Sequence, residues 1–190
     1  MLSAFMVFPV LSVFADSYYY STPFLIGMTL GIYGLSNAIM QIPFGILSDR
    51  YGRKKIILFG LLIFFAGSVI CSITDNIYYL ILGRALQGAG AISGVLMALL
   101  SDTTSLKNRT ISMAIVGVAI GAAFFSAFIL GPIVSKYFNL SGLFTLIVIL
   151  TLVSIVIMLT FRYDSRVSHK QFKYEFWDLI LNKKLNPYFF

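Results

Sequence analysis

The sequence predicts an all-α membrane protein, and two observations carry this prediction. Hydrophobic residues make up 59% of the 190 residues, charged residues only 11%, and the mean hydropathy is +0.92, whereas charged residues make up about 25% of an ordinary soluble domain. The apolar runs are also continuous, while the strands of a membrane β-barrel alternate in polarity. Helices that satisfy their own backbone hydrogen bonds within the bilayer are therefore expected.

Six apolar runs are candidates for transmembrane helices, each of which needs about 20 residues. They cover residues 2 to about 18, 23–47, 56–74, 77–100, 111–135 and 140–161. The first run is the weakest, because it contains Pro9 and has no cation before it. It lacks the basic leader and the clear cleavage site of a signal peptide, so we interpret it as a span. Residues 1–161 are expected to form one six-helix transmembrane bundle.

The cations predict how the chain lies in the membrane. Of the 14 Lys and Arg residues, Arg84 lies inside a span and Lys136 lies on one side, while all the others lie on the opposite side or after the sixth span. Because Lys and Arg favour the cytoplasmic side, both termini are expected in the cytoplasm of a multi-pass protein of the inner (plasma) membrane. The net charge of +7 fits anionic lipid headgroups, and no nucleic-acid partner is expected.

Residues 162–190 differ in composition and are expected to form a cytoplasmic central linker. Their apolar side chains recur at helical spacing, which predicts an amphipathic helix on the membrane surface; they are Phe172, Phe176, Leu179 and Ile180. A solvated linker is the alternative interpretation. The final residues, NPYFF, are typical of the start of a seventh span.

Metal and cofactor chemistry has little support in the sequence. Cys71 is the only cysteine and His169 the only histidine, and neither has a second ligand at metal spacing. No metal, no cofactor and no enzymatic activity are expected. All seven acidic residues lie at helix ends or in connections, so no buried proton-carrying carboxylate is visible either.

The connection between the second and third spans combines a glycine turn with several charges. Gly52 is suited to a positive φ, Gly45 leaves room for a neighbouring helix, and Asp49 lies four residues before Arg53, which allows an ion pair. Asp49 is equally suited to face a helix N-terminus. A plain positively charged loop is the alternative interpretation, and it accounts for the cations but not for Asp49; these cations are Arg50, Arg53, Lys54 and Lys55.

Arg84 is the only charged residue well inside a predicted span. An arginine at the centre of a membrane costs about 2.5–3.5 kcal/mol on insertion scales, so such a residue is a functional candidate. Gln87 and Gly88 follow it on the same helix face. The alternative is a side chain that extends to the outer interface of the membrane.

A line of polar side chains crosses the second span. Tyr33, Asn37 and Gln41 recur at intervals of four residues, and such a line is expected to face a cavity rather than lipid. Small residues predict helix packing elsewhere, and these residues include Gly88, Gly117 and Gly121. Gly131 and Pro132 are expected to weaken the fifth span near its outer end.

Three motifs carry a resemblance to a known family. The stretch GILSDRYGRK, residues 45–54, resembles the signature between helices two and three of the major facilitator superfamily. LILGRALQGAGA, residues 80–91, is similar to its second motif, and GVAIGAAFFSAFILGP, residues 117–132, is similar to its antiporter motif, although Ser135 and Lys136 replace the paired glycines that follow it. The chain resembles the N-terminal half of the drug:proton antiporter branch, which implies a bundle built as a 3+3 inverted repeat.

The resemblance implies roles for individual residues. The acid at Asp49 would face a helix of the C-terminal half, while Arg53 would pair with an acid at the cytoplasmic end of helix four, here Asp102. A conformational latch is thus expected from Gly45, Asp49, Arg50, Gly52, Arg53, Lys54 and Asp102. Arg84 and Gln87 are expected to act in proton coupling.

The function that the resemblance implies is proton-coupled efflux of drugs or other amphipathic solutes by alternating access. The substrate cavity would lie between helices one, two, four and five, with Tyr33, Asn37 and Gln41 on its wall. The expected partners are a small-molecule substrate, protons, the lipid bilayer and a missing C-terminal six-helix half, or a second copy of the chain in its place. A nutrient facilitator or symporter, a remnant that does not transport, and a dimerising half-transporter are the alternatives.

Overall fold

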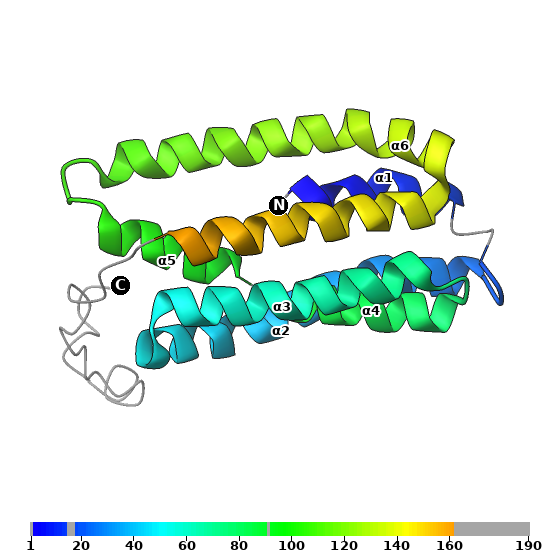
Figure 1. The fold of residues 1–190 in the computed structure, drawn as a ribbon, viewed down its shortest axis with the longest axis horizontal. Helices are drawn as coiled ribbons and strands as arrows, with labels where there is room; N and C mark the ends of the chain where they lie inside the picture. The colour runs from blue at the N-terminus through cyan, green and yellow to red at the C-terminus, as the bar shows by residue number, and fades with distance from the viewer. Residues whose placement is uncertain (1, 15–17, 91, 162–190) are drawn as a thin grey trace, which may run out of the picture.

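The computed structural model describes residues 2–14, 18–90 and 92–161, and all of its regular elements are helices (Figure 1). They are α1 (Leu2–Phe14), α2 (Pro23–Tyr51), α3 (Arg53–Ile73), α4 (Ile77–Ala89), α5 (Ser93–Thr103) and α6 (Arg109–Thr160). The all-α prediction is confirmed. The predicted linker and amphipathic helix of residues 162–190 lie outside the described residues.

Four stretches of the described chain are long and apolar enough to cross a membrane, namely residues 23–51, 53–73, 77–103 and 109–160. Within the run predicted to start the bundle, the described residues 2–14 form a helix of 13 residues, which is fewer than the roughly 20 residues that a span needs. A count of six passes therefore stays a prediction.

Helix α6 is interrupted at Asn139, where φ is 59° and ψ is −174°. Figure 1 shows the chain turning back on itself in this part of α6, so the helix has two arms that run in opposite directions. Asparagine tolerates a positive φ better than most residues. The two arms correspond to the predicted runs 111–135 and 140–161, and a single non-helical residue separates them.

The helical run predicted over residues 77–100 is divided in two. Helix α4 ends at Ala89, where the backbone N–H of Gly90 donates to the carbonyl of Leu86, and helix α5 begins at Ser93. The expectation of one continuous helix was wrong. Glycine is the residue that favours the end of a helix, and the sequence has two glycines, Gly88 and Gly90, just before the division.

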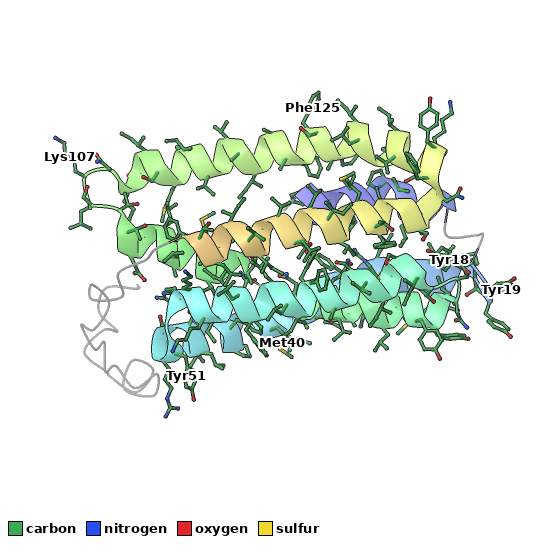
Figure 2. All side chains as sticks on the ribbon, in the orientation of Figure 1. Tyr18, Tyr19, Met40, Tyr51, Lys107 and Phe125 are labelled. Carbon is green, nitrogen blue, oxygen red and sulfur yellow. The ribbon has the colours of Figure 1, made fainter. Side chains whose placement is uncertain are left out.

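The starts of α2 and α4 are joined by backbone hydrogen bonds. The N–H of Tyr19 donates to the carbonyl of Asp75 at 2.9 Å, and the N–H of Ile77 donates to the carbonyl of Tyr19 at 3.3 Å. Figure 2 shows Tyr19 at one end of the bundle and Tyr51 at the opposite end. The molecule thus has a Tyr19 end and a Gly52 end, since Gly52 follows Tyr51.

The buried apolar side chains form two clusters. One joins α1 to α3, α4 and the second arm of α6 and includes Met6, Leu80 and Phe144, and the other lies toward the Gly52 end and includes Phe44 and Ile57. Large apolar side chains also cover the outside; Phe125 is 69% exposed and points away from the bundle (Figure 2). An outer surface of this kind is suited to lipid rather than water.

Glycines set the closest helix contacts. A Cβ at Gly67 would lie 2.6 Å from the carbonyl oxygen of Gly83, so α3 and α4 approach backbone to backbone. A Cβ at Gly88 would collide with the carbonyl of Tyr33, and one at Gly131 would lie 2.8 Å from the carbonyl oxygen of Met6. Gly88 therefore lies at the contact of α4 with α2, and Gly131 at the contact of α6 with α1.

The packing role predicted for Gly117 and Gly121 has no contact to support it in the described chain. Both glycines are exposed on the first arm of α6, and a Cβ at either would have nothing within 4 Å. Small residues permit a close approach between helices, but their spacing does not say which face has a neighbour. Pro132, beside the packed Gly131, is likewise exposed within α6.

Candidate functional site

The junction of α2 and α3 is shorter than the sequence suggested. Residues 48–55 were expected to form the connection, but α2 continues to Tyr51 and α3 begins at Arg53, so Gly52 alone connects them. Its φ of 97° and ψ of 139° lie in a region that is nearly restricted to glycine. The prediction of a positive φ at this residue is confirmed.

Arg53 joins three helices at this junction. Its guanidinium lies 2.5 Å from Asp49 of α2 and 3.0 Å from Asp102 of α5, and it also donates to the hydroxyl of Ser48 at 2.6 Å. We call Asp49, Arg53 and Asp102 the charge cluster. The Arg53 side chain is 14% exposed, against 65% for Asp49, so the Arg53–Asp102 contact is the more sheltered of the two.

The other residues predicted for the latch occupy different environments. Lys54 donates to the carbonyls of Leu159 and Phe161 at 3.0 and 2.6 Å and so holds the end of α6. Arg50 is exposed and lies over the ring of Tyr51. No neighbouring helix in the described residues approaches Gly45, where a Cβ would have nothing within 4 Å.

Arg84 is fully buried in the middle of the bundle, with 0% of its surface exposed. Its Nη1 donates to Gln87 Oε1 at 2.8 Å, and Gln87 Nε2 donates to the hydroxyl of Ser68 at 2.8 Å. The guanidinium carbon lies 4.4 Å from the ring centre of Tyr33. This network links α2, α3 and α4, and the side chain does not extend toward the interface.

Two nitrogens of Arg84, Nε and Nη2, have no hydrogen-bond partner within the described chain. The ion pairs of the described residues all involve Arg53, so no carboxylate neutralises Arg84 there. A buried cation without a counter-charge is energetically costly. The centre of the bundle is therefore electropositive.

A cavity of about 490 Å³ lies beside this network. Tyr33 and Gln87, which both contact Arg84, form part of its wall. Apolar side chains of α3 and of the second arm of α6 form most of the rest. Further polar lining comes from Asn37, Ser93, Thr151 and Ser154.

The substrate cavity predicted from the sequence stays a prediction, since this cavity has other walls. The sequence suggested helices one, two, four and five, but the described cavity is lined by α2 to α5 and by residues 150–158 of α6, without α1 or the first arm of α6. Gln41 does not line it and is exposed instead, beside Gly94 of α5. A line of polar residues at intervals of four drifts around a helix of 3.6 residues per turn, so Gln41 points away from the cavity that Tyr33 and Asn37 reach.

Sequence reasoning missed several residues of the site. Ser68 completes the hydrogen-bond chain from Arg84, while Ser93 and Ser154 line the cavity. Isolated serines within apolar runs are a weak signal, because a serine hydroxyl also bonds its own helix backbone. Among the described residues no group of His, Cys, Asp and Glu has the geometry of a metal site.

The chain was compared with known families and curated proteins. The family profile described as "Major Facilitator Superfamily" matches residues 1–181. The chain is 50% identical over 157 residues to the inner membrane transport protein YajR of Escherichia coli (strain K12), a match that covers 83% of this chain and 35% of that protein. It is 43% identical over 192 residues to the uncharacterized transporter BU466 of Buchnera aphidicola subsp. Acyrthosiphon pisum, covering 100% of this chain and 49% of that one.

The fold was compared with solved structures. The crystal structure of the POT family transporter PepTSo superposes with a TM-score of 0.72 at 18% identity, over 83% of this chain and 34% of that chain. At this identity the match shows the fold alone. The chain spans half or less of the length of the relatives it matches.

Proposed function

Because the chain belongs to the Major Facilitator Superfamily, we propose that it serves transport of small amphipathic molecules out of the cell, driven by protons through alternating access. In transporters built from repeats, one bundle rocks against another around a site near the middle of the membrane. The observation that carries the proposal is the charge cluster, in which Arg53 holds Asp49 and Asp102 from two different helices.

The charge cluster is suited to act as a conformational latch. The contact between Arg53 and Asp102 is mostly sheltered from solvent, while Asp49 keeps an exposed carboxylate that a helix N-terminus of a second bundle can approach. Breaking one contact would free Arg53 to exchange partners. Gly52 and Lys54 belong to this latch because they fix the turn and the end of α6 beside it.

Arg84 and Gln87 are proposed to act in proton coupling. A guanidinium keeps its proton throughout the physiological range, so Arg84 is not itself the carrier. Its unneutralised charge would favour proton release from any acid that comes close to it. The described spans hold no such acid, so the proposal assigns the carrier to the bound substrate or to a second bundle.

The transporter is proposed to lie in the inner membrane with both termini in the cytoplasm and with six passes in this chain. A second half of similar size, supplied by a further chain segment or by a second copy, completes the transport path. The support is that the chain covers only 35–49% of the length of its curated relatives.

Exchange of charges tests the latch. The full-length transporter is reconstituted in proteoliposomes, and efflux of anionic, neutral and cationic fluorescent amphipaths is measured under an imposed pH gradient. Arg53→Asp and Asp102→Arg should each lower the rate at least tenfold, because each puts like charges in place of a pair whose opposite charges lie 3.0 Å apart, and the double variant should recover part of that loss. Lys107→Asp, exposed at the same end, is the matched control.

Three results would count against the proposal. If the double variant is no more active than either single variant at equal reconstitution, Arg53 and Asp102 do not pair in the latch. Transport that ignores the pH gradient favours a facilitator, and no transport of any probe by the assembled wild-type protein favours a remnant.

A further inference from the structure

The cavity beside Arg84 is lined by both apolar and polar side chains. Ile57, Leu61 and Phe64 of α3 are apolar, while the second arm of α6 adds apolar residues together with Thr151 and Ser154. Tyr33 and Asn37 of α2 and Ser93 of α5 also line the cavity, and we call these three residues the polar wall. The cavity volume of about 490 Å³ lies within the range of sites for small organic molecules.

The polar wall offers hydrogen-bonding groups that the chain leaves unused. In the described residues, the side chains of Asn37 and Ser93 and the hydroxyl of Tyr33 make no hydrogen bond, whereas the hydroxyls of Thr151 and Ser154 are bonded to their own helix. Of these free groups, that of Tyr33 belongs to a ring whose centre lies 4.4 Å from the guanidinium carbon of Arg84. A polar ligand head in the cavity can hydrogen-bond to the free groups.

The charge behind this wall has a definite sign. Arg84 contacts two residues of the lining, Gln87 through a hydrogen bond and Tyr33 through its ring. Its two unpaired nitrogens are buried, and the acids of the described chain, Asp49, Asp75 and Asp102, lie at helix ends or between helices. A bound molecule therefore experiences a positive potential that no carboxylate of the described residues cancels.

We propose that this cavity binds small amphipathic acids, with the carboxylate toward Tyr33 and Asn37 and the apolar body against α3 and α6. The inference rests on the proposed transport function, and it specifies the class of substrate. Two unit charges roughly 8 Å apart, at an effective dielectric constant of about 20, change a dissociation constant by tenfold or more. An acid is thereby favoured over its neutral amide, and an amine of the same shape is disfavoured.

The experiment compares three probes of the same shape and different charge. Binding of 2-naphthoate, 2-naphthamide and 2-naphthylmethylammonium to the full-length protein in phosphatidylcholine nanodiscs is measured by equilibrium dialysis, with empty nanodiscs as the baseline. We expect 2-naphthoate to bind at least tenfold more tightly than the amide, and the ammonium probe to bind least. Equal constants for the three probes, or a preference for the ammonium, would overturn the proposal.

Two variants test whether Arg84 causes the preference. Arg84→Met removes the charge at similar length and should make 2-naphthoate and 2-naphthamide bind alike, while Arg84→Lys should keep the preference in part. Asn37→Asp, on the half-buried face of α2, places an acid in the cavity and should shift the preference toward the ammonium probe even if Arg84→Met fails to fold. Lys136→Met, exposed on α6, is the charge control and should change nothing.

A lipid headgroup is the other source of an anion. Adding phosphatidylglycerol to the nanodiscs should leave the binding of 2-naphthoate unchanged, and displacement of the probe would show a lipid site instead. Binding and transport are measured separately, so the two proposals fail in different ways. If the protein transports but binds the three probes equally well, this inference is wrong and the proposed function stands. If the protein binds the probes as expected but does not transport, the proposed function is wrong and this inference stands.

Discussion

Replacing Gly67 with alanine tests how closely α3 and α4 are packed. The new Cβ would lie 2.6 Å from the carbonyl oxygen of Gly83 and 2.7 Å from the backbone nitrogen of Gln87, while ordinary contact begins at 3.4 Å. Both neighbours are backbone atoms, so the helices have to separate. Overpacking of this kind costs about 1–3 kcal/mol, and alanine regains about 0.5–1 kcal/mol of helix propensity. A net loss of about 1 kcal/mol, and of at most about 2.5 kcal/mol, is expected.

Gly121→Ala is the matched control. Gly121 also lies inside a helix, but its Cβ would meet nothing within 4 Å, so only the gain in helix propensity of about 0.5–1 kcal/mol applies. The free energy of unfolding is measured for both variants by denaturant titration in mixed micelles, with helix content followed by circular dichroism. If the two variants agree within about 0.5 kcal/mol, the inferred contact between α3 and α4 is wrong.

Two further predictions concern the Gly52 end. Gly52→Ala should lower the free energy of unfolding by about 1–3 kcal/mol, because alanine is strained at φ 97°, whereas Gly45→Ala, in helical backbone with free space, should not lower it in the same titration. Lys54→Met should speed hydrogen exchange in the last turn of α6, because Lys54 donates hydrogen bonds to the carbonyls at that end of the helix. The free energy of unfolding should change by less than about 1 kcal/mol. Equal exchange rates in Lys54→Met and in the exposed control Lys55→Met would refute this prediction.

Local rules were enough to predict part of the Gly52 end. Gly52 is the only residue there that adopts a positive φ without strain, and the pair of Asp49 and Arg53 follows from their spacing of four residues, which stays within reach across the turn at Gly52. Asp102, 49 residues away from Arg53, was assigned by family resemblance, because spacing says nothing about contacts between distant segments.

The central site shows the limit of such rules. The burial of Arg84 was suggested by its place in an apolar run, but its partners depend on which faces of α2, α3 and α4 meet. For the same reason Gly67 and Gly83, which set a close contact, were not distinguished from Gly117 and Gly121, which face outward. The division between α4 and α5 was missed because a glycine-rich run serves helix packing as well as helix ends.

The two ends of the bundle should respond differently to ionic strength. The Tyr19 end is joined by neutral backbone hydrogen bonds between Tyr19, Asp75 and Ile77, which dissolved ions do not screen. At the Gly52 end, part of the junction depends on charges that solvent reaches, since Asp49 is 65% exposed. The screening length falls from about 8 Å at 0.15 M salt to about 3 Å at 1 M. Concentrated salt therefore weakens the ion pair between Asp49 of α2 and Arg53 of α3, while the hydrogen bonds beside the starts of α2 and α4 stay in place.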